Sequence, residues 1–140
     1  MSEGEAWDRL RTARIGHMAS VNPDGSPHVV PFVFAVNDRT IYWTVDAKPK
    51  RTRELKRLSN IRSNPHVEMV VDGYSEDWGT LWWVRARGVA RILEPGKEWD
   101  RALTLLSEKY EQYEAGPPPG PVVAIDVTHV VDWEASAGDG

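Results

Sequence analysis

The chain of 140 residues has no cysteine, no long apolar run and no excess of positive charge. The absence of cysteine excludes disulfides, thiolate catalysis and cysteine-ligated metals. The formal net charge of −4 argues against a general nucleic-acid binder, because such proteins usually present a basic surface. No segment approaches the roughly 18 to 20 apolar residues needed to span a bilayer, and the N-terminus has no apolar signal core. We therefore expect a cytoplasmic protein with no nucleic-acid partner and no membrane span.

The common catalytic motifs are also missing. The sequence contains no G-x-S-x-G elbow, no P-loop, no G-x-G-x-x-G loop and no H-E-x-x-H helix. The histidines show no metal-ligand spacing, which favours structural roles for all four of them: His17, His28, His66 and His129. If the protein is an enzyme, we expect its reactive group to belong to a cofactor.

A basic cluster is the strongest local feature that is present. Seven of the seventeen Lys and Arg residues fall within fifteen positions, at the junction of a predicted strand and a predicted helix: Lys48, Lys50, Arg51, Arg53, Lys56, Arg57 and Arg62. A helix start offers unpaired N–H groups and a partial positive charge, so this junction suits an anion such as a phosphate. The alternative is a solvated basic helix face. We favour the anion site, because the cations concentrate at the helix entry.

The pattern of apolar residues predicts one mainly β domain over residues 1–134, followed by a flexible tail at 135–140. Six short strands are expected, at 15–21, 27–36, 40–45, 66–71, 81–93 and 122–133. Ser2 and Glu5 form a capping box that opens a predicted helix with Ala6, Trp7 and Leu10 on one face. Helical spacing also appears at Leu55, Leu58 and Ile61 and over about 97–110. So many short, mostly antiparallel strands in one small domain favour a β-barrel with flanking helices.

The predicted strand at 81–93 has two different faces. Every second residue from Trp82 is apolar or small and should face the core, whereas Trp83, Arg85 and Arg87 share the other face. Solvation of that row and contact with a ligand or a partner subunit are equally compatible with the pattern. The chain also has seven tryptophans, and some of them should line a flat ligand or a subunit contact.

The order of these segments resembles the pyridoxamine-phosphate-oxidase-like split-barrel superfamily. The resemblance covers about residues 6 to 133 and rests on PDGSPHVVPFVFAV, IYWTVD, KPKRTRELKRLSNIRSNPHVEMVVD and WWVRARGVARIL. Within the superfamily, the chain is most similar to the actinobacterial branch of enzymes that depend on the deazaflavin coenzyme F420. The resemblance implies a six-stranded antiparallel split barrel and a homodimer with the cofactor in a groove between the subunits.

The resemblance also implies the cofactor contacts. Lys50 and Arg51 match the basic pair that meets the cofactor phosphate, and Lys48 is an additional candidate. Val30, Pro31 and Phe32 match the strand whose backbone runs along the ring edge. Trp43 and Thr44 match the aromatic–Thr pair that ends the third strand beside the ring. Trp83 matches a further cofactor position, and Arg85 follows it on the same face. Trp83 stands where oxidases that use FMN often carry Gln, which favours F420 over FMN. The spread of cations suits the phosphate and oligoglutamate tail of F420 better than a single phosphate.

The function implied is an F420-dependent oxidoreductase that transfers a hydride between the deazaflavin and a small organic substrate. The basic and aromatic extension with which the oxidases proper bind vitamin B6 is missing after Trp133, so vitamin B6 oxidation is not expected. No catalytic residue is assigned, and the proton for the product could come from solvent or from Tyr74. The alternatives are an FMN-dependent oxidase or reductase, and a non-catalytic protein that carries flavin, F420 or haem.

Overall fold

The computed structural model describes residues 1–45, 51–116 and 120–136, with side chains omitted for 51–55. In this part of the chain, seven antiparallel strands form one continuous sheet in the order β2-β1-β5-β6-β7-β4-β3. The strands are β1 (Gly16–Val21), β2 (Pro27–Phe32), β3 (Ala35–Asn37), β4 (Thr40–Thr44), β5 (His66–Gly73), β6 (Trp82–Leu93) and β7 (Val122–Glu134). The helices are α1 (Glu3–Thr12), α2 (Arg51–Ser63), α3 (Lys97–Lys109) and the short 3₁₀ turns η1 (Trp78–Thr80) and η2 (Glu111–Tyr113).

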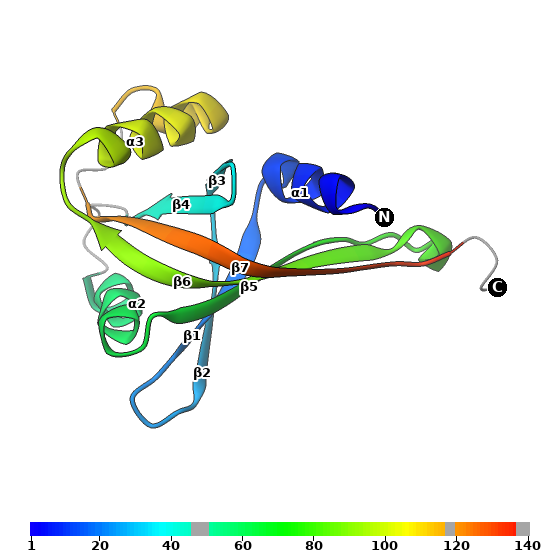
Figure 1. Ribbon diagram of the computed structural model, residues 1–140, viewed down its shortest axis with the longest axis horizontal. Helices are drawn as coiled ribbons and strands as arrows, with labels where there is room; N and C mark the ends of the chain where they lie inside the picture. The colour runs from blue at the N-terminus through cyan, green and yellow to red at the C-terminus, as the bar shows by residue number, and fades with distance from the viewer. Residues whose placement is uncertain (46–50, 117–119, 137–140) are drawn as a thin grey trace.

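The sheet curls into a split barrel with the helices around it, so the predicted fold class is confirmed (Figure 1). The β1–β2 hairpin turns through Gly25, whose φ of 86° is costly for residues with a side chain. At the other end of the molecule, β5, β6 and β7 continue beyond the barrel as a long arm beside α1. No helix in the described ranges is long and apolar enough to cross a membrane.

The strand count differs from the prediction because the segment 27–36 is two strands. β2 pairs with β1, whereas β3 pairs with β4, so the chain changes partner at Val33 and Phe34. At this break, the buried Phe34 N–H donates to the Tyr110 hydroxyl (3.1 Å), whose single proton has the carbonyl oxygens of Phe34 and Arg14 as acceptors (both 3.0 Å). A side chain from the end of α3 thus satisfies backbone groups that a strand partner would otherwise satisfy.

The core lies inside the curled sheet and explains the two faces of β6. Val84, Ala86 and Ala90 are buried on the inner face, as the alternation predicted. Gly88 is also on this face, at a bulge where a Cβ atom would lie 2.5 Å from the carbonyl oxygen of Asp126. α1 covers one end of the core with Ala6, Trp7 and Leu10, and the Ser2 hydroxyl caps its start by accepting from the Glu5 N–H (3.1 Å).

An ion-pair network attaches α3 to the sheet. The Arg91 guanidinium donates to Glu98 from two nitrogens (both 2.8 Å) and to Asp126 (2.6 and 3.0 Å). Tyr42 donates a further hydrogen bond to Glu98 (2.8 Å). These donors, Arg91 first, lower the pKa of Glu98 to about 2. The start of α3 is therefore fixed over β4, β6 and β7, and its far end, with Tyr110, reaches the break between β2 and β3.

Candidate functional site

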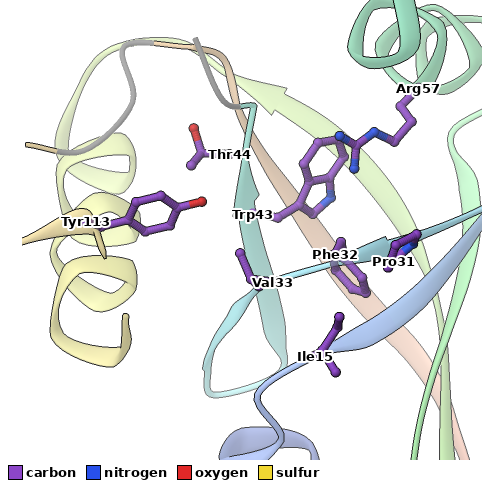
Figure 2. Close-up of a pocket in the computed structure, with 8 residues that line it drawn as sticks. All are labelled: Ile15, Pro31, Phe32, Val33, Trp43, Thr44, Arg57 and Tyr113. Atoms are coloured by element: carbon purple, nitrogen blue, oxygen red, sulfur yellow. The ribbon is translucent and has the colours of Figure 1, made fainter. Parts of the chain in front are cut away.

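A pocket of about 290 Å³ opens where β2 and β4 end, between α2 and η2 (Figure 2). Its wall is mostly apolar and aromatic, with one cation. The lining residues are Ile15, Pro31, Phe32, Val33, Trp43, Thr44, Arg57 and Tyr113. A wall of this composition suits a flat organic ring that carries a negative group. We call it the β4-end pocket.

Trp43 and Thr44 reach the pocket because β4 is held firmly up to its last residue. β4 pairs with β7 along its whole length, and the Thr44 hydroxyl donates to the Pro121 carbonyl (3.1 Å). Trp43 is 1% exposed, and its indole N–H has no acceptor among the described residues. A buried N–H donor without an acceptor is costly, so an unpaired one in a pocket wall is available to a ligand acceptor.

Arg57 contributes the positive charge of the pocket. It projects from α2, and its guanidinium carbon lies 5.0 Å from the centre of the Trp43 ring system, a cation–π distance (Figure 2). The pocket therefore combines an aromatic surface, an unused N–H donor and a guanidinium group at one wall. This combination can bind a planar, anionic cofactor but contains no evident nucleophile or acid–base pair.

Aromatic packing fixes further parts of the pocket wall. The Phe32 and Phe34 rings stack at 5.0 Å, and Tyr113 meets Tyr110 edge-on at 6.1 Å. Burial raises the pKa of Tyr110, whose hydroxyl is fully used by the backbone groups at the β2–β3 break. Tyr110 consequently holds this wall in place from behind and does not face the pocket as an acid.

The residues predicted from the sequence separate into four groups. Pro31, Phe32, Trp43 and Thr44 are brought together in the β4-end pocket. Val30 precedes Pro31 on β2 and pairs with Met18 of β1, but it does not line the pocket. Lys48 and Lys50 lie outside the described residues, and Arg51 begins α2 with its side chain undescribed.

Trp83 and Arg85 lie away from this pocket, on the outer face of β6. The Arg85 guanidinium packs over the Trp83 ring (5.3 Å) and pairs with Glu68 (2.8 Å), which also lies 3.8 Å from Arg87. Three large apolar side chains are also exposed: Val29 on β2, and Val131 and Trp133 on β7, the strand that pairs with β6. Tyr74, the proton donor considered above, is 70% exposed and does not line the pocket either.

Four lining residues were not selected from the sequence: Ile15, Val33, Arg57 and Tyr113. Arg57 was counted in the basic cluster, and its place within the helix predicted after Lys50 was the signal that could have singled it out. Nothing local marks Tyr113, because its place depends on how α3 ends. No group of three or more potential metal ligands occurs in the parts of the chain described above.

Comparison with solved structures supports the fold assignment. A conserved hypothetical protein from Mycobacterium tuberculosis is 26% identical, with a TM-score of 0.79, and the match covers 96% of this chain and 86% of that one. A FAD-binding protein from Mycobacterium smegmatis is 25% identical, with a TM-score of 0.65 and coverage of 95% and 94%. A haem storage protein from Vibrio cholerae shares the fold at 14% identity, with a TM-score of 0.72 and coverage of 94% and 93%.

No curated protein matches the chain at a significant level. The family profile described as pyridoxamine 5'-phosphate oxidase, however, matches residues 3–134, almost the whole length. The seven-stranded split barrel and the matched span agree with the resemblance noted from the sequence. The chain belongs to the pyridoxamine 5'-phosphate oxidase family.

Proposed function

We propose that the protein is an oxidoreductase that uses coenzyme F420 to reduce a small organic substrate. The observation that carries this proposal is the pairing of the Trp43 indole with the Arg57 guanidinium in an otherwise apolar pocket. A deazaflavin has a flat ring, hydrogen-bond acceptors on the ring edge and a phosphate, which correspond to the aromatic wall, the unused Trp43 N–H and Arg57. When bound, the deazaflavin supplies the hydride chemistry.

The residues of this chain then have binding and orienting tasks. The Trp43 N–H fixes the rotation of the ring, Arg57 offsets the negative charge of the phosphate, and Phe32 with Pro31 excludes water from one ring edge. Lys48, Lys50 and Arg51 are proposed to extend the anion site from the adjoining segment, on the strength of their positions in the sequence. No side chain in the pocket wall is required to form a covalent bond.

The active form is proposed to be a homodimer. The outer face of the sheet exposes Val29 (61%), Val131 (44%) and Trp133 (43%) around the Glu68–Arg85 ion pair. A surface with several large apolar side chains around an ion pair is typical of a subunit contact. In such a dimer, Trp83 and Arg85, which lie outside the pocket of their own chain, could meet the cofactor of the partner subunit.

An FMN-dependent oxidase or reductase is the second candidate. The specific observation in favour of a flavin, though not of FMN in particular, is the 25% identity to a FAD-binding protein over nearly the whole of both chains. Trp83 favours F420, because this side chain cannot supply the amide contact that Gln makes in flavin-using members. A non-catalytic carrier would use the same binding residues, so only turnover separates it from an enzyme.

The experiment is a turnover assay that follows cofactor oxidation by visible absorbance. Reduced F420 is mixed with the protein and with a panel of quinone and enone acceptors, and reduced FMN is tested in parallel. We expect protein-dependent oxidation of F420 by at least one acceptor, with the Arg57→Met variant at least ten-fold slower at low cofactor concentration. Binding of F420 without oxidation by any acceptor would assign the protein to the carriers, and turnover with FMN alone would favour the second candidate.

A further inference from the structure

Two cations flank a single tyrosine ring just outside the β4-end pocket. The Arg14 guanidinium carbon lies 4.7 Å from the centre of the Tyr110 ring, and the Lys109 ammonium nitrogen lies 5.4 Å from the same centre. The Lys109 nitrogen also lies 4.3 Å from the centre of the Phe34 ring. Arg14 comes from the segment between α1 and β1 and Lys109 from the end of α3, so the fold brings together cations far apart in the sequence.

Neither cation has a carboxylate partner within the described ranges. Lys109 Nζ is shielded from solvent and makes no hydrogen bond, and the ion pairs of the structure do not involve Arg14. Burial, and secondarily the charge of Arg14, lowers the pKa of Lys109 to about 8. Two neighbouring like charges without a counter-ion destabilise the fold, and such an arrangement is found preferentially where a ligand supplies the missing charge.

The pair adjoins the pocket through three contacts. Ile15, which follows Arg14 in the chain, lines the pocket, and so does Tyr113, which packs edge-on against Tyr110. Phe34, beneath the Lys109 ammonium, stacks on the pocket residue Phe32. In Figure 2, Ile15 and Tyr113 lie on the side of the pocket away from Arg57. A molecule held near Arg57 that extends past these two residues would therefore approach Arg14 and Lys109.

We propose that Arg14 and Lys109 form a second anion subsite, which binds a carboxylate of a molecule held in the β4-end pocket. The proposal rests on the proposed function, since the pocket must hold that molecule. The planar fork of Arg14 matches a carboxylate, and the flexible Lys109 side chain turns off the Phe34 ring to complete the contact. Aromatic surroundings favour a monoanion over a phosphate dianion, whose desolvation costs more.

The carboxylate has two sources, the oligoglutamate tail of F420 or an acidic acceptor substrate. Both present the same group to the subsite, so the cations alone do not distinguish them. FMN has a phosphate and no tail carboxylate, which makes it the comparison ligand. The Lys109→Met and Arg14→Gln variants remove the charges and keep an unbranched stem in each side chain, and Lys97→Met removes an exposed lysine of the same helix as a control.

The first measurement needs no cofactor. Trace acetylation at pH 8 followed by mass spectrometry gives the labelling rate of Lys109 with and without γ-glutamylglutamate or benzoate, at constant ionic strength. We expect either carboxylate to slow the labelling of Lys109 at least three-fold, to leave Lys97 unaffected, and to lose this effect in Arg14→Gln. Labelling of Lys109 that is indifferent to both carboxylates would overturn the subsite, whatever the cofactor proves to be.

The second measurement identifies the source of the carboxylate by titration of the wild type and the Arg14→Gln/Lys109→Met double variant. A ten-fold or greater loss of F420 affinity, with FMN affinity within two-fold, assigns the subsite to the cofactor tail. Unchanged affinity for both, together with the carboxylate protection above, assigns it to the acceptor substrate. Equal losses for F420 and FMN would contradict the proposal, because FMN has no carboxylate. A wild type that binds neither cofactor would refute the proposed function, while the protection result would still decide the subsite.

Discussion

Replacing Tyr110 by Phe should destabilise the protein strongly for the loss of one oxygen atom. The hydroxyl accepts from the buried Phe34 N–H (3.1 Å), and its single proton has the carbonyl oxygens of Phe34 and Arg14 as acceptors (both 3.0 Å). Phe34 is 0% exposed, so water cannot replace the lost acceptor.

The size of the effect follows from these contacts. Leaving a buried N–H unsatisfied costs about 1–3 kcal/mol, and the lost donated bond adds about 0.5–1.5 kcal/mol. We therefore expect the free energy of unfolding to fall by about 2–4 kcal/mol. With a urea m-value of about 2 kcal/mol/M, the midpoint of urea unfolding should fall by about 1–2 M.

The assay is urea unfolding followed by tryptophan fluorescence, with Tyr74→Phe as the matched control. The Tyr74 hydroxyl reaches only the exposed Glu76 carboxylate (3.3 Å), so its removal should change the free energy of unfolding by less than about 0.5 kcal/mol. If Tyr110→Phe is no more destabilising than the control, the β2–β3 break does not depend on Tyr110, and the reasoning is wrong.

Three further predictions concern the pocket, the α3 network and the dimer. Arg57→Met should weaken FMN binding by about 10- to 100-fold, because one charge-assisted hydrogen bond contributes about 1.5–3 kcal/mol. Riboflavin has no phosphate, so its binding should weaken by less than about 3-fold. Equal losses for the two ligands in calorimetric titrations would exclude Arg57 from the phosphate site. Glu98→Gln should lower the free energy of unfolding at pH 7 by about 1 kcal/mol, a value reduced to allow for the partial exposure of Glu98. The pKa of Glu98 in the folded protein is about 2, below its usual value of 4.5, so the difference between variant and wild type should shrink as the pH falls from 4.5 towards 2. A difference in urea unfolding that does not change with pH would contradict the ion-pair account. Val131→Glu on the outer sheet face should turn a dimer into a monomer in sedimentation velocity, and a wild type that is itself monomeric at micromolar concentration would argue against the proposed assembly.

Alternation and turn chemistry predicted most of the strands because both are local. The inner face of β6, the turn at Gly25 and the Ser2 cap all follow from residues within a few positions of one another. The division of 27–36 into two strands was not predictable in this way. It depends on the Tyr110 hydroxyl, 76 residues later in the chain, and no local pattern shows that contact.

The candidate site divides along the same line. Trp43, Thr44, Pro31 and Phe32 sit at strand ends that the sequence pattern located, and they do line one pocket. Tyr113 and Lys109 come from segments whose positions depend on how α3 packs on the sheet, and that packing also brings Lys109 to the same ring as Arg14. The alternation of β6 correctly placed Trp83 and Arg85 on one face but could not tell which pocket, or which subunit, that face serves.

Parallel titration of the purified protein with F420 and FMN tests the central claim most directly. Visible absorbance and tryptophan fluorescence report binding. The Trp43→Phe variant keeps an aromatic ring but removes the unpaired N–H, so it shows whether the ligand occupies the β4-end pocket. The account predicts that F420 binds at least ten-fold more tightly than FMN and that Trp43→Phe weakens F420 binding about 5- to 30-fold, the equivalent of a hydrogen bond of about 1–2 kcal/mol. Equal or reversed affinities for the two cofactors, or F420 binding that Trp43→Phe leaves unchanged, would contradict it.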